Sequence, residues 1–196
     1  MLTRSASIVS LVAIVVWFSG CNTAPTPQGK LDRLDQTSMA SLDRMKQTDP
    51  TLGPVLDKAA GWAIFPSVGE GAIGVGGLYG RGALWDHGKR TGYCDVSAGT
   101  IGAELSGQKY SELIVFQDKL ALNRFKSNVF AFDAKAAAVA AKAGAAAKAN
   151  YADGVIVFTH SIGGLMLQAS IGGQQFTYEP TTAARDNARA YEARAD

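Results

Sequence analysis

The stretch Gly61–Gly107 holds 13 of the 22 glycines of the chain, and this density limits what the chain can fold into. A helix would not tolerate it, because each interior glycine costs roughly 0.5–1 kcal/mol relative to alanine. A flexible linker is not expected either, because large apolar residues recur there at a regular spacing. Between Ala72 and Trp85 that spacing is two residues, which predicts a strand or hairpin with one bulky face and one nearly bare face. The residues of the bare face are Ala72, Gly74, Gly76, Gly80 and Gly82, interrupted by Leu78 and Leu84.

The bare face has two interpretations. Glycine in a strand often marks a bend or the close approach of another backbone, and it can also leave room for a ligand. We favour the packing interpretation. It predicts an α+β fold in which a strongly curved antiparallel sheet, or a small barrel-like sheet, is flanked by helices.

Length and charge narrow the class of protein. At 196 residues there is room for one domain and short extensions. The formal net charge is only +2, whereas a dedicated nucleic-acid binder usually carries a marked basic excess. Nucleic acid is therefore not an expected partner.

The N-terminus has the pattern of a secretory signal. Arg4 precedes an apolar run of 11 residues, Ile8–Phe18, which is too short for a spanning helix of about 20. The segment FSGC that follows resembles the lipobox of bacterial lipoproteins, which implies that Cys21 becomes the acylated first residue of the mature chain. If the cell is Gram-negative, Asn22 then favours the outer membrane, facing the periplasm. An ordinary signal peptide cleaved nearby is the alternative.

These observations predict the division of the chain. Residues 1–20 form a lipoprotein signal peptide, 21–29 a tether, 30–180 one domain, and 181–196 a polar C-terminal helix or tail. With Cys21 acylated, Cys94 is the one cysteine left, and its strand-like surroundings predict a buried small hydrophobic side chain.

Within the domain, helical spacing predicts a first helix at Lys30–Gln47, ended by Asp49 and Pro50. A second is predicted at Thr51–Ala60. A third is predicted at Asp118–Ser127, with Leu122 and Phe125 on its inner face. Apart from the glycine-rich block, predicted strands cover Trp62–Phe65, Ser111–Phe116, Asp153–Ser161, 165–171 and 176–179. Two Gly-Gly turns join the last three into an expected antiparallel meander. Ala131–Ala149 is ambiguous between helix and strand, and we favour strand over its first half.

No motif for catalysis or metal binding stands out. Gly69, Gly71 and Gly74 match G-x-G-x-x-G, but a glycine-studded strand follows instead of the helix that a dinucleotide site needs. H-E-x-x-H, G-x-S-x-G and paired cysteines do not occur in the sequence, and His87 lies in the turn WDHGKR. We therefore expect a protein that is not an enzyme and has no cofactor or metal.

Basic residues are the remaining candidates for binding. Lys and Arg near an anionic bilayer contribute about 1 kcal/mol each, so a modest cluster could contact lipid head groups. The alternative is a solvated face of mixed charge. The candidate head-group contacts are Arg81, Lys89, Arg90, Lys109, Lys119, Arg124 and Lys126.

Four segments together resemble the SYLF domain family, also known as the yeast actin-patch actin-binding domain family. They are GWAIFPSVGEGAIGVGGLYGRG, TGYCDVSAGTIGAELSGQKYSELIVFQD, LNRFKSN and DGVIVFTHSIGGLMLQASIGGQQFTY. The resemblance runs from about Leu52 to Tyr178. It implies a compact mixed domain with a curved sheet and flanking helices. In eukaryotic members the family is associated with binding phosphoinositide membranes and, in some fungal members, actin.

A secreted bacterial lipoprotein does not meet actin, so the expected partner is the membrane. The expected function is that of a lipid-anchored envelope protein whose domain binds anionic phospholipid head groups without catalysis. The alternative is a structural or interaction module that binds another envelope protein.

Overall fold

A computed structural model describes residues 27–71, 75–101, 109–128, 131–132, 138–140, 142–161 and 174–186. The predicted signal peptide and Cys21 lie outside these residues. The predicted strand at 165–171 lies outside them as well.

Three α-helices form where the helical periodicity predicts them. α1 spans Pro27–Thr48, α2 spans Leu52–Lys58 and α3 spans Lys119–Lys126. The Asp118 side chain caps α3 by accepting a hydrogen bond of 2.9 Å from the Ala121 amide. Among the described residues, no helix has both the length and the apolar character needed to cross a membrane.

Six longer antiparallel strands make up most of the sheet, in the order β8-β3-β2-β1-β4-β7. The short strand β5 pairs antiparallel with β8 at one edge, and the short strand β6 pairs parallel with β7 at the other. The strands are β1 Gly61–Gly71, β2 Val75–Asp86, β3 Lys89–Ile101, β4 Lys109–Phe116, β5 Ala131–Phe132, β6 Ala138–Ala140, β7 Val155–Ser161 and β8 Gln174–Pro180.

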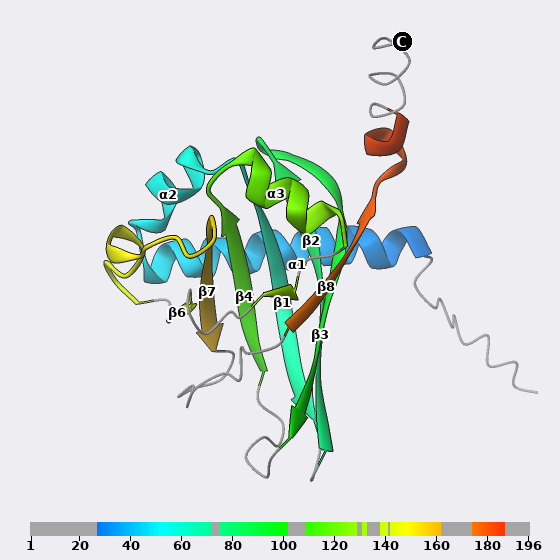
Figure 1. Ribbon diagram of the computed structural model, residues 1–196, viewed down its shortest axis with the longest axis horizontal. Helices are drawn as coiled ribbons and strands as arrows, with labels where there is room; N and C mark the ends of the chain where they lie inside the picture. The colour runs from blue at the N-terminus through cyan, green and yellow to red at the C-terminus, as the bar shows by residue number, and fades with distance from the viewer. Residues whose placement is uncertain are drawn as a thin grey trace, which may run out of the picture.

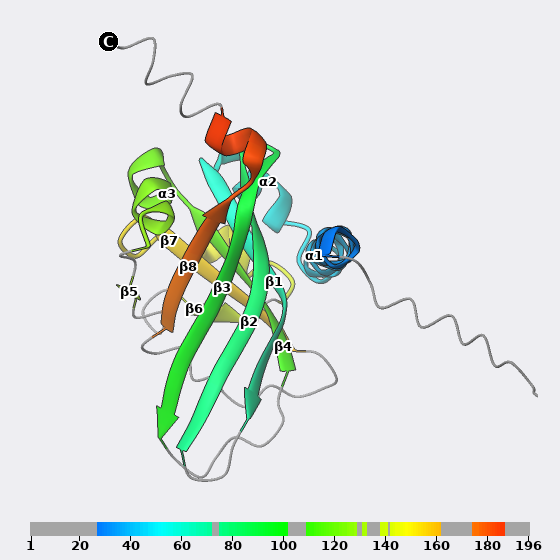
Figure 2. The ribbon, with the colours of Figure 1, turned by 90° about the vertical axis from the view of Figure 1, so that its right-hand side faces the viewer.

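The sheet confirms the α+β class and the antiparallel arrangement, but the prediction of a strongly curved or barrel-like sheet is wrong. The sheet is open and twisted (Figures 1 and 2). Among the described strands, no ladder joins β7 to β8, because β7 pairs with β4 and β6 while β8 pairs with β3 and β5. The glycines therefore mark close packing and not closure of a barrel.

One other local prediction needs correction. The strand predicted at Trp62–Phe65 does not end before Pro66, because the register of β1 with both neighbours shifts between Ile64 and Val68, and this bulge accommodates the proline. The first half of the ambiguous stretch Ala131–Ala149 contains the two short strands β5 and β6, as favoured from the sequence, and its second half contains a 3-10 helix, η2, at Ala146–Lys148. Residues 182–186 are helical, as the polar C-terminal segment predicts.

Helices pack on both faces of the sheet (Figure 2). We call the two sides the α3 face and the α1 face. On the α3 face, the Phe125 ring packs at a tilt against those of Phe116 and Phe176, with ring centroids 5.0 and 5.4 Å apart. The buried thiol of Cys94 belongs to this core, as predicted. On the α1 face, Leu42 and Met45 of α1 are buried against the sheet.

Asp49 fixes the corner between α1 and α2. Its buried carboxylate accepts hydrogen bonds from the Thr51 amide and hydroxyl, and from the amides of Gly144 and Ala146. Burial alone would raise the pKa of Asp49, but these hydrogen bonds outweigh it and hold the pKa below its usual value.

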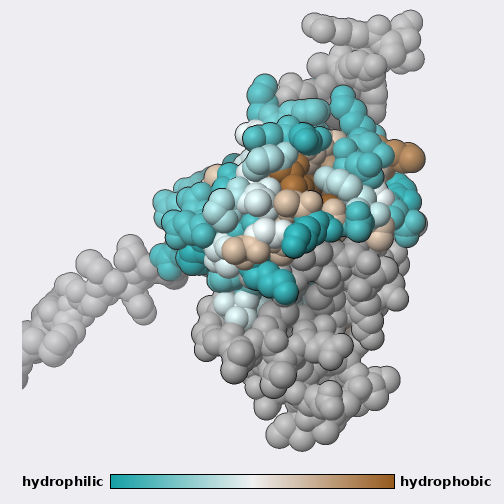
Figure 3. Space-filling view, turned by 90° about the vertical axis from the view of Figure 1, so that its left-hand side faces the viewer, coloured by the Kyte–Doolittle hydropathy of each residue, from teal (hydrophilic) through white to brown (hydrophobic). Residues whose placement is uncertain are grey.

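Seen from the side that carries α2, the described surface is mostly hydrophilic, with a small hydrophobic area at its centre (Figure 3).

The bare glycine face is the α3 face, and side chains from neighbouring strands occupy its space. A Cβ at Gly82 would overlap the Ile64 carbonyl oxygen and lie 2.7 Å from the Phe65 ring. A Cβ at Gly92 would overlap the Tyr178 ring. These contacts confirm the packing interpretation at both positions.

We therefore expect Gly82→Ala to destabilise the domain by about 1–3 kcal/mol, the usual cost of overpacking. Gly77→Ala, in the same strand, is the matched control, because its Cβ would meet its nearest neighbour, the Ala98 carbonyl oxygen, at 3.9 Å. Urea unfolding can be followed by the fluorescence of Trp62 and Trp85, whose rings stack with centroids 4.4 Å apart. Equal stability of the two variants would contradict the packing role of Gly82.

Candidate functional site

The seven predicted basic contacts do not form one surface. Lys109 pairs with Gly69 at one end of the sheet. Lys89 pairs with Asp86 at the opposite end, where Asp86 also pairs with Gly61 of β1. The fold therefore does not bring these seven residues together into a single basic patch.

Two of the predicted contacts hold the fold together instead. The Lys126 ammonium lies 2.6 Å from an Asp86 carboxylate oxygen and so ties α3 to the end of β2. The Arg124 guanidinium donates a 2.6 Å hydrogen bond to the Asp153 carbonyl, in the turn before β7. These two groups are engaged within the protein.

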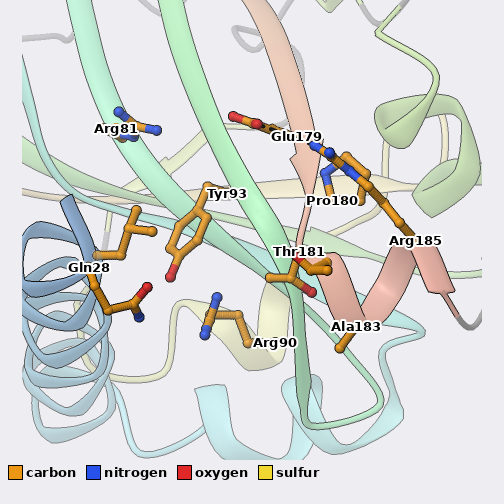
Figure 4. A pocket seen from close by; sticks show the side chains of 11 residues that line it. Gln28, Arg81, Arg90, Tyr93, Glu179, Pro180, Thr181, Ala183 and Arg185 are labelled. Atoms are coloured by element: carbon orange, nitrogen blue, oxygen red, sulfur yellow. Dashed lines mark hydrogen bonds and ion pairs between the residues drawn. The ribbon is translucent and has the colours of Figure 1, made fainter.

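Arg81 and Arg90, in contrast, converge on one pocket with a third arginine, Arg185 (Figure 4). Strands β2 and β3 supply Arg81 and Arg90, and the helical residues after β8 supply Arg185. The pocket has a volume of about 400 Å³. Its other lining residues are Gln28, Leu31, Tyr93, Glu179, Pro180, Thr181, Thr182 and Ala183.

Arg90 is held by the pocket walls. Its Nε lies 2.9 Å from Asp35 of α1, and its guanidinium lies 4.7 Å from the centre of the Tyr93 ring. Nη1 of Arg90 is buried and has no hydrogen-bond partner among the described residues. Arg90 is thus a fixed cation in the wall of the pocket.

Asp35 completes this arrangement. Burial raises the pKa of the Asp35 carboxyl, although the charge of Arg90 and a hydrogen bond from Tyr93 act to lower it. Burial and the negative charge of Asp35 likewise raise the pKa of Tyr93. The Tyr93 hydroxyl therefore stays a neutral donor at physiological pH.

The other two arginines have weaker partners. Arg81 lies 3.8 Å from Asp95, and Arg185 lies 3.3 Å from Glu179. In both pairs the two side chains are more than a third exposed, and such surface pairs contribute at most about 1 kcal/mol. An anionic ligand can therefore displace either carboxylate at little cost.

A second polar site lies inside the protein, and the sequence reasoning did not identify it. Glu112 of β4 accepts a 3.0 Å hydrogen bond from Nε2 of Gln174, which lies on β8. Both side chains are fully buried, and the Oε1 atom of each has no partner among the described residues. The one signal in the sequence is the alternation of Glu112 with the core residues Ile114 and Phe116 along SELIVF.

Burial raises the pKa of Glu112 to about 7, although hydrogen bonds from Gln174 and Tyr110 act to lower it. Glu112 can therefore exchange a proton near neutral pH. Among the described residues, no group of three or more His, Cys, Asp or Glu side chains is placed to hold a metal ion.

Comparison with known proteins gives one distant relative. Beta cell expansion factor A of Aeromonas veronii is 27% identical over 138 residues, which cover 69% of this chain and 52% of that protein. The chain thus spans about half the length of this curated relative. No protein-family model matches the chain.

The raised pKa of Glu112 predicts how stability depends on pH. A carboxyl that is harder to ionise in the folded protein does not lower the free energy of unfolding below about pH 4.5, where it is protonated in both the folded and the unfolded state. As the pH rises, the group lowers the free energy of unfolding, and above about pH 7 this loss of stability levels off at about 3 kcal/mol.

Glu112→Gln should remove this dependence and stabilise the domain at pH 8, because the new amide can also donate to the Oε1 atom of Gln174. Urea unfolding at pH 5 and pH 8 measures the effect, with the exposed Glu179→Gln as the matched control. A variant that is no more stable than the wild type at pH 8 would refute this account of Glu112.

Proposed function

We propose that this chain is a lipid-anchored protein of the bacterial envelope whose domain binds the anionic head groups of phospholipids without catalysis. The observation that carries the proposal is the convergence of Arg81, Arg90 and Arg185 on one pocket. Guanidinium groups bind phosphate through paired hydrogen bonds, so three of them suit a phosphate-bearing head group. Of the seven predicted contacts, Arg81 and Arg90 are the two that this proposal retains at the pocket.

The position of the pocket along the chain also supports the proposal. Gln28 lines it, seven residues after Cys21, so the two residues can be at most about 25 Å apart. If Cys21 carries the lipid anchor, the pocket is kept close to the bilayer surface. A weak intrinsic affinity is then sufficient, because the anchor raises the local concentration of head groups.

The resemblance to the SYLF domain family supports the same function, because eukaryotic members of that family are associated with binding phosphoinositide membranes. The proposed location is the outer membrane of a Gram-negative cell, facing the periplasm, because Asn22 follows the lipobox-like segment. The proposal includes neither actin nor nucleic acid as a binding partner.

Arg81→Gln/Arg185→Gln should weaken binding to anionic vesicles roughly 30-fold, because two cations near the surface contribute about 2 kcal/mol together. These two are chosen because their ion pairs are exposed, so their loss should leave the fold intact. Co-sedimentation of the chain from Asn22 onward with phosphatidylglycerol vesicles measures binding, and phosphatidylcholine vesicles serve as the neutral reference.

Lys109→Gln/Lys119→Gln removes the same charge away from the pocket and is the matched control. If both double variants lose binding equally, the protein senses general charge and the pocket is not the site. Wild-type binding that persists at high salt would also contradict a contact based on charge. If the wild-type chain binds neither kind of vesicle, the alternative of a module that binds an envelope protein gains support.

A further inference from the structure

A second hollow adjoins the arginine pocket and differs from it in chemistry. It has a volume of about 370 Å³ and lies between the N-terminal half of α1 and β2. Leu31 and Arg81 line both hollows, so the two are neighbours. The lining residues of this second hollow are Lys30, Leu31, Arg33, Leu34, Thr37 and Arg81.

The second hollow is apolar at its base and cationic at its rim. Leu31 and Leu34 are half-buried and pack against the core of the α1 face. Lys30 and Arg33 are exposed, so their charged ends can reach solvent while their aliphatic stems cover apolar surface. The lining includes three cations and no acidic residue.

Arg81 lies where the two hollows meet, and it has freedom to turn. Its distance of 3.8 Å from Asp95 is too long for a hydrogen bond, and its side chain is 48% exposed. A ligand with an anionic end and an apolar end therefore finds matching partners on the two sides of this residue.

We propose that the two hollows form one binding site for a single-chain anionic amphiphile, such as an alkyl phosphate or a fatty acid. Its head group lies among Arg81, Arg90 and Arg185, and its chain lies along Leu31 and Leu34. The inference rests on the proposed function for the head-group half of the site, and it adds the chain and thereby the class of ligand. A site of this kind takes an individual molecule out of a bilayer or micelle, whereas surface binding leaves the chain in the membrane.

The test is calorimetric titration of the mature chain carrying Cys21→Ser, which prevents acylation. Three probes are compared below their micelle-forming concentrations: dodecyl phosphate, butyl phosphate and dodecyl maltoside. We expect dodecyl phosphate to bind at least ten-fold more tightly than butyl phosphate, which has the same head group and a short chain. Dodecyl maltoside has the same chain as dodecyl phosphate and a neutral head group, and we expect it to bind at least ten-fold more weakly than dodecyl phosphate.

Leu34→Gln should reduce the affinity for dodecyl phosphate at least five-fold and leave that for butyl phosphate unchanged. Met39→Gln is the matched control, because Met39 is an exposed apolar residue of the same helix and does not line either hollow. If Leu34→Gln does not fold, Thr37→Glu tests the same hollow from an exposed position, and its carboxylate should weaken dodecyl phosphate binding to a similar extent.

Equal affinity for dodecyl phosphate and butyl phosphate would overturn the inference, and it would leave head-group binding intact. Failure of dodecyl phosphate to bind, while anionic vesicles still bind in co-sedimentation, would also overturn it and would leave the proposed function standing. If the chain does not bind anionic vesicles but binds dodecyl phosphate tightly, the result would support the amphiphile site and refute recognition of the bilayer surface.

Discussion

The close approach of aromatic rings to bare backbone at Gly82 and Gly92 is the constraint on which the rest of the structure depends. Phe65 lies against Gly82, and Tyr178 lies against Gly92. The second contact seats β8 beside β3, and β8 carries Glu179 and continues into the residues that bring Arg185 to the arginine pocket. A side chain at Gly92 would displace β8, and the pocket would lose one of its walls.

Helix α1 serves both the core and the proposed binding site, and its two halves differ accordingly. Leu42 and Met45 in the C-terminal half are fully buried against the sheet. Leu31 and Leu34 in the N-terminal half are only half-buried, and they line the second hollow. The apolar stripe of α1 is therefore buried in the core at its C-terminal end and partly exposed at its N-terminal end.

Periodicity was sufficient to predict the three helices, most of the described strands and the packing role of the glycines, because these features depend on neighbouring residues. It was not sufficient for the edges of the sheet. The strands β5 and β6 contain two and three residues, too few to show a period. The candidate site was half predicted: Arg81 and Arg90 were named, but Arg185 and the Glu112–Gln174 contact were not. Glu112 and Gln174 are 62 residues apart, and a local pattern carries no information on such a contact.

The three arginines differ in how firmly they are held, and this difference bears on what the pocket can recognise. Arg90 is fixed by Asp35 and Tyr93, so its positive charge is already in place before a ligand arrives. Arg81 and Arg185 have exposed carboxylate partners, which a ligand must displace. A group with several anionic oxygens can replace both carboxylates and also accept from Arg90, whereas a single weak acceptor cannot. The arrangement therefore favours a phosphate, whose several oxygens can contact more than one guanidinium group, over a neutral polar head group.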